Sequence, residues 1–215
     1  MAGQCLGRHR QSESDRLLGL KDETHWVHME IFEGPYGGRL ARTTWMPSTR
    51  STRNNPIEDI ETHLPLRVLR FELREDVAGA GKWRGGLRSV REFTFLSDGG
   101  ASVEAEGHRY QPWGFLGGSE GMPAKLNLLA GGTTRALASK VPHMNFAKDG
   151  RFVCYGPAGG GYGDPLERDP AKVADDVMDE VISVETAKRD YGVVVSAKCV
   201  VDHAATEKAR VGRIR

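Results

Sequence analysis

Residues 69–106 read LRFELREDVAGAGKWRGGLRSVREFTFLSDGGASVEAE, and this stretch decides the fold. Apolar and charged residues alternate strictly at its start, a period of two that predicts a half-buried strand with Leu69, Phe71 and Leu73 facing the core. Glycines crowd the segment that follows, where a loop or hairpin connection is expected at 79–86. Two more strand patterns lie on either side of a turn-forming SDGG, at residues 91–96 and 101–106. The middle of the chain is therefore predicted to be β-rich.

The same patterns extend toward both ends of the chain. Further strand candidates lie at residues 25–32, 125–129, 151–155 and 193–195. Helix signals gather near the end, with N-cap residues at Asp169, Ser183 and Asp202 and a stop signal at Gly192. Residues 1–23 are polar without a clear period, which predicts a flexible lead-in before an ordered unit over 24–215. The predicted fold class is α+β: a β-rich body with long Gly-rich loops and C-terminal helices.

Composition excludes several classes of function. Thirty Lys and Arg residues against 29 Asp and Glu give a net charge of +1, which removes the electrostatic basis for binding nucleic acid or an anionic membrane. No apolar run approaches the ~18 residues that a membrane span needs, and the first residues lack the apolar core of a secretory signal. The three cysteines are scattered and odd in number. A cytoplasmic protein is therefore expected.

One candidate site is the string NNPIEDIETH, which concentrates amides, carboxylates and a histidine at residues 54–63. If residues 56–63 are helical, Asp59 and His63 share a face at i, i+4, a spacing that suits metal binding or a charge-relay pair. The string follows a long stretch without apolar period, and binding residues favour such loops. The alternative is an ordinary surface helix.

A second candidate is Glu104, Glu106 and His108, spaced by two along a predicted strand. Alternate side chains of a strand project to one side, so the three could bind a divalent metal or act as acid and base. The alternative is the solvated face of an edge strand, which the glycine at position 107 favours because it weakens the strand there.

The third candidate is GPAGGGYGDP at residues 156–165. Consecutive glycines could present free backbone N–H groups to an anion, or they could permit a backbone crossing that only glycine fits. The string lacks the Gly-Lys-Ser/Thr ending of a nucleotide loop, and the chain has no Gly-x-Ser-x-Gly elbow. No cofactor or metal site is evident in the chain itself.

Several strings together resemble a known family. The sequence is similar to the hydantoinase B/oxoprolinase family, the B-type subunits of ATP-dependent N-methylhydantoinase and 5-oxoprolinase, and to the alpha subunits of acetone and acetophenone carboxylases. The matching strings occur in the family's order over about residues 30–195: GGR (37–39), NNPIEDIE (54–61), PLRV (65–68), FELR (71–74), GAGKWRGG (79–86), REF (91–93), GGGYGDP (159–165) and RDYGV (189–193).

The resemblance implies one component of a cyclic-amide hydrolase that opens hydantoin or 5-oxoproline rings. Such a component works in a hetero-oligomer with an A-type, ATP-binding subunit, and the complex would use ATP and a divalent metal. Family members are longer at the N-terminus, and their His-Asn-Asp-Pro and Gly-Thr-His metal segment has no counterpart here. The chain therefore resembles the C-terminal part of a B-type subunit over residues 24–215.

Within that family, Asn54, Asn55, Glu58 and His63 are expected near the substrate pocket, where they would position or polarise a ring amide. Their chemistry, not the family motif, suggests these roles. Gly159, Gly160 and Gly161 are expected to be structural or to line the pocket with backbone N–H groups. Two alternatives stay open: an alpha subunit of the acetone carboxylase type, and a non-catalytic interaction module or remnant.

Overall fold

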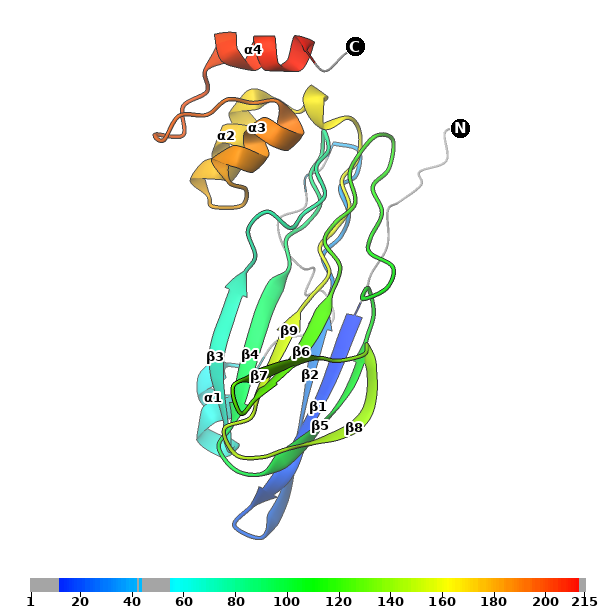
Figure 1. Ribbon diagram of the computed structural model, residues 1–215, viewed down its shortest axis with the longest axis vertical. Helices are drawn as coiled ribbons and strands as arrows, with labels where there is room; N and C mark the ends of the chain where they lie inside the picture. Colours follow the sequence, from blue (N-terminus) through cyan, green and yellow to red (C-terminus); the bar gives the residue numbers. More distant parts are fainter. Residues whose placement is uncertain (1–11, 42, 44–54, 213–215) are drawn as a thin grey trace.

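A computed structural model describes residues 12–41, 43 and 55–212 and confirms the α+β class with a β-rich body (Figure 1). Two antiparallel sheets make up this body. The first contains, in spatial order, β2 (Thr24–Glu33), β1 (Ser12–Lys21), β5 (Gly99–Ala105) and β8 (Lys140–Phe146). The second contains β3 (Leu66–Leu73), β4 (Ser89–Phe95), β9 (Arg151–Tyr155), β6 (Lys125–Ala130) and β7 (Thr133–Ala136). All of the predicted strands except residues 193–195 are present.

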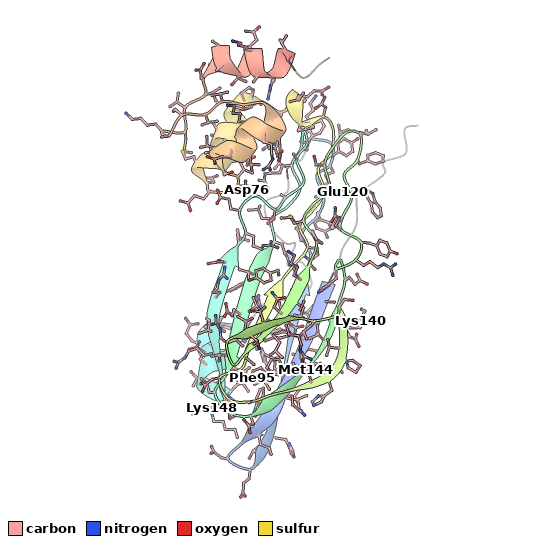
Figure 2. The ribbon with its side chains drawn as sticks, viewed as in Figure 1. Asp76, Phe95, Glu120, Lys140, Met144 and Lys148 are labelled. Carbon is pink, nitrogen blue, oxygen red and sulfur yellow. The ribbon has the colours of Figure 1, made fainter. Side chains whose placement is uncertain are left out.

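The main core lies between the two sheets. Phe95 and Phe146 stack with their ring centroids 4.4 Å apart, and Phe152 meets Phe146 edge to face. Leu17 and Phe93 are fully buried in the same cluster. Figure 2 shows Phe95 and Met144 inside this body. Burial of these side chains supplies most of the free energy that holds one sheet to the other.

The prediction of a flexible lead-in over residues 1–23 is wrong for residues 12–21, which form β1. This strand pairs with β2 on one side and with β5 on the other. Its Leu17 side chain is fully buried, and Asp15 is buried beside the Cys154 thiol at 3.3 Å. Asp15 occupies an inward position where the apolar period of a strand requires an apolar residue. The sequence pattern therefore did not predict β1. Residues 1–11 lie outside the described residues.

The predicted inward face of β3 is also wrong in part. A bulge between Val68 and Arg70 shifts the register, and buried Leu66 lies before it. Leu69, Phe71 and Leu73 are all between 44% and 48% exposed. A bulge adds one residue to a strand and changes which side chains face inward, and a period of two cannot reveal it.

Beyond the strands, Gly-rich loops extend from the body and carry the helices at their far end (Figure 1). The segment 156–163 runs through the middle of these loops. A Cβ added to Gly159 would lie 2.3 Å from the Tyr36 carbonyl oxygen, whereas at Gly160 it would meet Trp113 and at Gly161 it would meet Ala80. Three successive residues thus face three different neighbouring segments, the geometry of an extended chain with three residues per turn.

Four α-helices and one 3-10 turn complete the part of the fold that the structure describes. Their bounds are α1 (Ile57–His63), η1 (Pro165–Glu167), α2 (Pro170–Met178), α3 (Val184–Tyr191) and α4 (His203–Val211). The predicted caps are confirmed, because the side chains of Asp169, Ser183 and Asp202 accept bonds from their own helix N–H groups. Gly192 ends α3 with φ 62°. Residues 193–195 form no strand; Val195 makes only an isolated bridge to Val201.

The helices α2 and α3 have an apolar core of their own, in which Val173, Ile182 and Tyr191 are buried against residues of the glycine loops, whereas Ile60 of α1 belongs to the main core. Asp76 connects the two parts: its N–H donates to the Val181 carbonyl at 3.1 Å, and its carboxylate accepts from Ser183 N–H at 2.8 Å. Figure 2 shows Asp76 at this junction. The helical end of the molecule is thereby fixed to the loops.

Candidate functional site

The predicted site on the string 54–63 lies on an exposed helix. Asn55, Glu58 and His63 are all exposed, and Asn54 lies outside the described residues. The expected i, i+4 pair is present, with His63 Nδ1 3.2 Å from the Asp59 carboxylate, but both side chains are more than half exposed. None of these residues lines any of the three cavities described below. This geometry matches an ordinary surface helix unless another polypeptide covers it.

The structure does not bring this helix together with Gly159, Gly160 and Gly161. The helix α1 precedes β3, and the glycine loops follow the other end of that strand. In Figure 1, α1 lies beside β3, at the opposite end of the sheets from the loops that carry α2 and α3. The two sets of predicted site residues therefore do not form one site within the described residues.

The three glycines make a tight backbone crossing. Gly159 N–H donates to the Gly86 carbonyl at 3.0 Å, and Gly161 N–H donates to the Ser119 carbonyl at 2.8 Å. These two N–H groups already have acceptors, so they are not offered to a substrate or anion. The structural role, one of the two that the sequence left open, is the one the geometry supports.

A polar cavity of about 550 Å³ lies where the glycine loops meet α2. Its lining combines one large aromatic side chain with cationic, acidic and hydroxyl groups: Ala41, Thr43, Trp83, Arg168, Lys172, Asp175 and Asp176. Small-molecule sites typically combine an apolar wall with a few convergent polar groups. Among the described residues, this cavity has the chemistry that best suits a polar ligand.

Two members of a buried triad of charges, Asp176 and Arg168, line this cavity. Asp176 is 1% exposed and accepts from both Arg84 and Arg168, with the closest distances 3.1 and 2.8 Å. Arg84 binds in a fork, since its Nε also reaches the carboxylate at 3.2 Å. Arg168 also donates to the Thr43 hydroxyl at 2.9 Å. The triad joins α2 to the glycine loops, and the charged side chains that line the cavity are two cations and two carboxylates.

Next to the triad lies Tyr191, which is 1% exposed. Burial raises the pKa of its phenol, and the nearby Arg168 and Arg84 cations only partly oppose the shift. The phenol therefore stays protonated at physiological pH. It is suited to donating a hydrogen bond and not to acting as a base.

Sequence reasoning missed Arg84, Arg168 and Asp176. Arg84 stands between glycines in the string GKWRGG, and Asp176 is the second of two adjacent aspartates. Burial distinguishes the second aspartate from the first, which is exposed. One signal for Asp176 was available: it lies three residues after Val173, so the two share the inner face of α2.

The second predicted cluster offers no metal site. Glu104 and Glu106 are exposed, as the solvated-face alternative predicts, and no group of three metal-ligating side chains occurs in the part of the chain that the structure describes. His108 is half-buried, and neither ring nitrogen is in hydrogen-bonding geometry with a partner there. Desolvation lowers the pKa of His108, an effect that the Lys140 charge strengthens and the nearby Glu106 backbone opposes.

His108 predicts a pH dependence of stability. Its folded pKa is lowered, so the unfolded chain binds the proton more readily below about pH 6.5. The free energy of unfolding is expected to be highest above that pH and to fall as the pH drops below it. Denaturant titrations at pH 7.5, 6 and 5 measure this loss. The variant His108→Gln should reduce the loss, and an equal loss in the variant would contradict the assignment to His108.

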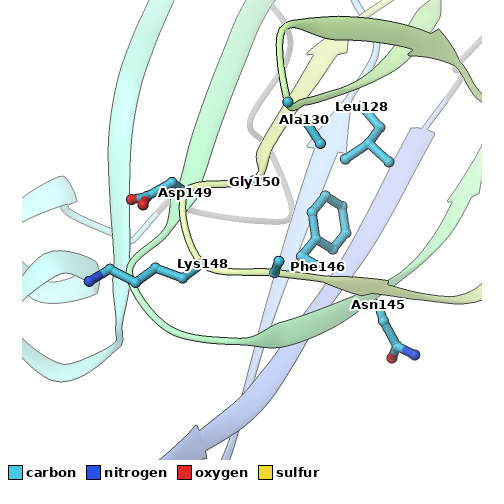
Figure 3. A pocket seen from close by; sticks show the side chains of 9 residues that line it. Leu128, Ala130, Asn145, Phe146, Lys148, Asp149 and Gly150 are labelled. Atoms are coloured by element: carbon cyan, nitrogen blue, oxygen red, sulfur yellow. The ribbon is translucent and has the colours of Figure 1, made fainter.

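Two other cavities are lined mainly by apolar side chains. One of about 190 Å³ lies beside the β6–β7 hairpin; in Figure 3, Leu128 and Phe146 point toward it, while the charged ends of Lys148 and Asp149 point away. Another, of about 760 Å³, lies along the β1–β2 hairpin, and its lining combines aliphatic residues with Trp26, His25, Ser97 and Asp98. The Ser97 hydroxyl donates to the Asp98 carbonyl and the Asp98 carboxylate accepts from Lys148 N–H, so neither is bonded to His25.

Comparison with known proteins assigns the chain to a family. The family model described as hydantoinase B/oxoprolinase matches residues 4–165. The chain belongs to the hydantoinase B/oxoprolinase family. The match includes residues 4–23, so the expectation that residues 1–23 fall outside the family's pattern is wrong. In addition, no helix in the described ranges is long and apolar enough to cross a bilayer.

Relatives within the family are considerably longer. The chain is 45% identical over 197 residues to a Pseudomonas sp. (strain NS671) protein named as the B-type subunit of a "Putative D-/L-hydantoinase", covering 89% of this chain and 33% of the relative. The ATP-dependent caprolactamase of Pseudomonas jessenii has the same fold, with TM-score 0.78 and 23% identity over 98% of this chain and 39% of that one. Nucleotide-free acetone carboxylase matches with TM-score 0.77 and 19% identity over 93% of this chain and 32% of that one.

Proposed function

We propose that this chain is a B-type component of an ATP-dependent complex that opens cyclic amides such as hydantoin or 5-oxoproline. The observation that carries the proposal is the 45% identity to a protein named as the B-type component of a hydantoinase. A relative named as the beta component of a caprolactamase, 32% identical over 162 residues, also acts by its name on a cyclic amide. The shared chemistry is cleavage of a ring C–N bond.

The described residues of this chain do not provide a complete catalytic set. The cavity at α2 offers two cations, two carboxylates, a hydroxyl and a tryptophan, but the Thr43 hydroxyl and the Asp176 carboxylate are bonded to Arg168 and not to each other. ATP activation of the ring carbonyl is proposed to come from an A-type subunit, which the word "subunit" in the relatives' names supports. ATP dependence is supported by the related caprolactamase and acetone carboxylase structures, both described as ATP-dependent. We place this assembly in the cytoplasm, where ATP is supplied.

The cavity at α2 is proposed to bind the polar end of the ring substrate. Lys172 and Arg168 would attract a carboxylate or an imide oxygen, and Trp83 would form the flat wall against the ring. A divalent metal is implied for the complex by the family resemblance. The described residues show no ligand set for it, so its ligands would come from outside these residues.

The test is ring opening by the complex purified through a tag on this chain. Hydantoin, 5-oxoproline and caprolactam are supplied with and without ATP, and the open-chain products are quantified by chromatography. Products that form only with ATP support the proposal. ATP-dependent carboxylation of acetone without ring opening would favour the second candidate, a carboxylase-type subunit, which the acetone carboxylase fold match supports. Absence of both activities would favour the interaction module.

Glu58 gives a separate prediction within the same complex. We propose that Asn54, Asn55, Glu58 and His63 approach substrate only when other polypeptide covers α1, because Asn55, Glu58 and His63 are exposed here. Glu58→Gln is then expected to lower turnover about 100-fold, the usual size of a lost acid–base contribution. Steady-state kinetics of the complex measure it, with Thr62→Ser on the same helix as control. Unchanged turnover in Glu58→Gln would remove Glu58 from the site.

A further inference from the structure

The strand β2 has two polar side chains buried on its core side and several aliphatic side chains exposed on its outer side. Its side chains that face the second sheet include buried His28 and Glu30, and Glu30 pairs with Arg91 at 2.7 Å. The alternate side chains face away from the body; His25 is polar, and Val27, Met29 and Ile31 are aliphatic. The three aliphatic side chains form, with Leu20 of β1, an apolar strip: Leu20 is 51% exposed, Val27 67%, Met29 53% and Ile31 36%.

This distribution of polar and apolar side chains is unusual in a sheet with one solvated face. Antiparallel sheets place apolar side chains on the core side and polar side chains on the solvent side. Here two polar side chains, His28 and Glu30, lie beside Trp26 on the core side, where ion pairing offsets their desolvation, and three aliphatic side chains face solvent. Contiguous exposed apolar side chains mark a surface that another element covers.

The strip also has a free strand edge and an adjoining groove. The strand β2 is the outermost strand of its sheet, so its far edge has no strand partner within the described residues. The groove of about 760 Å³ along the β1–β2 hairpin includes two residues of the strip, Leu20 and Val27. An unpaired edge beside apolar side chains is a template for an added strand.

We propose that this strip docks the polypeptide that makes up the other two thirds of the family's length. The chain covers 33% of the Pseudomonas sp. hydantoinase relative and 27% of the caprolactamase relative, so most of a family-length B-type chain lies outside it. Permanent interfaces are more apolar than transient ones, which resemble ordinary protein surface. The four aliphatic side chains of the strip therefore fit a permanent contact, such as the contact between two parts of one subunit.

The inference rests on family membership and not on the proposed reaction. A complex with any activity, or with none, would still bury this strip. The occupant is defined by chemistry as an aliphatic segment with unpaired backbone N–H and C=O groups. It belongs either to the same polypeptide or to a separate B-type chain.

Photo-crosslinking in the source organism tests the proposal. A benzoyl-phenylalanine replaces Met29 in one strain and Val200, a 63% exposed residue outside the strip, in the control strain. Peptides crosslinked at position 29 are expected to come from B-type sequence outside the region of this chain, and the control position should give few or none of them. Crosslinks at position 29 to a second copy of residues 12–212, to an A-type subunit, or to nothing would overturn the proposal.

A charge substitution provides the second measurement. Val27→Lys is expected to lower the yield of the crosslink from position 29 to the B-type segment at least about tenfold, because a lysine charge cannot be buried in an apolar contact. The melting temperature of the chain should stay within about 2 °C, because the side chain is exposed. Val200→Lys, at nearly equal exposure, should change neither quantity. An unchanged crosslinking yield in Val27→Lys would contradict the proposal.

Discussion

Gly160→Ala is expected to prevent the chain from folding. An added Cβ would lie 2.0 Å from the Trp113 carbonyl oxygen and 2.5 Å from its carbon, where folded proteins tolerate nothing closer than about 3 Å. The obstacle is backbone, which cannot rotate away as a side chain can. The Trp113 segment is also tied to the glycine string, because Phe115 N–H donates to the Gly161 carbonyl at 2.9 Å. The loss is expected to exceed about 5 kcal/mol, comparable with the whole stability of many domains.

The matched control is Gly212→Ala. Gly212 ends α4 with right-handed backbone angles, and the nearest atom to an added Cβ would be 3.7 Å away. Its free energy of unfolding should change by less than about 0.5 kcal/mol. Circular dichroism and denaturant titration of both variants measure the contrast. A folded Gly160→Ala protein of near-native stability would show that the loops are not packed as described.

Asp176→Asn is expected to cause the second largest loss, roughly 3–5 kcal/mol of unfolding free energy. Asp176 is the carboxylate that two almost fully buried guanidinium groups share, Arg84 at 0% and Arg168 at 3% exposure. The amide keeps the shape but removes the negative charge, so the two buried cations lose the carboxylate that they share. The α2 helix would lose its polar connection to the glycine loops, and the cavity beside it would open.

The preceding residue provides the control. Asp175 is on the same helix but exposed, so Asp175→Asn should alter stability by no more than about 0.5 kcal/mol. Thermal and chemical unfolding of the two variants compare a buried with an exposed aspartate one position apart. Equal losses in the two variants would mean that the triad does not hold the helices.

Much of the fold could be predicted because local chemistry agrees with the tertiary structure there. Asp169 and Ser183 cap the helices that they were expected to cap, and alternating residues form β4 and β5. The misses share one cause. In β1 a buried carboxylate interrupts the apolar pattern, and in β3 a bulge changes the inward face after Val68. Both depend on partners distant in sequence.

The site was harder to predict than the fold. Residues 54–63 contain many amide, carboxylate and imidazole groups. Asn55, Glu58 and His63 are nevertheless exposed, on α1 or just before it. The charges of the cavity at α2 come from positions that look ordinary one at a time, and only folding brings Arg84 within reach of Asp176, 92 residues away. The string at 159–161 was recognised as unusual, and its physical reason is the contact with three neighbouring segments.

Native mass spectrometry of the complex isolated from the source organism through this chain tests the central claim most directly. The expected result is an assembly in which the 215 residues are held with an A-type subunit and with the remaining B-type sequence, and from which the A-type subunit dissociates on denaturation. A lone 215-residue monomer, stable and without partners, would contradict the assignment to a multi-subunit, ATP-dependent hydrolase.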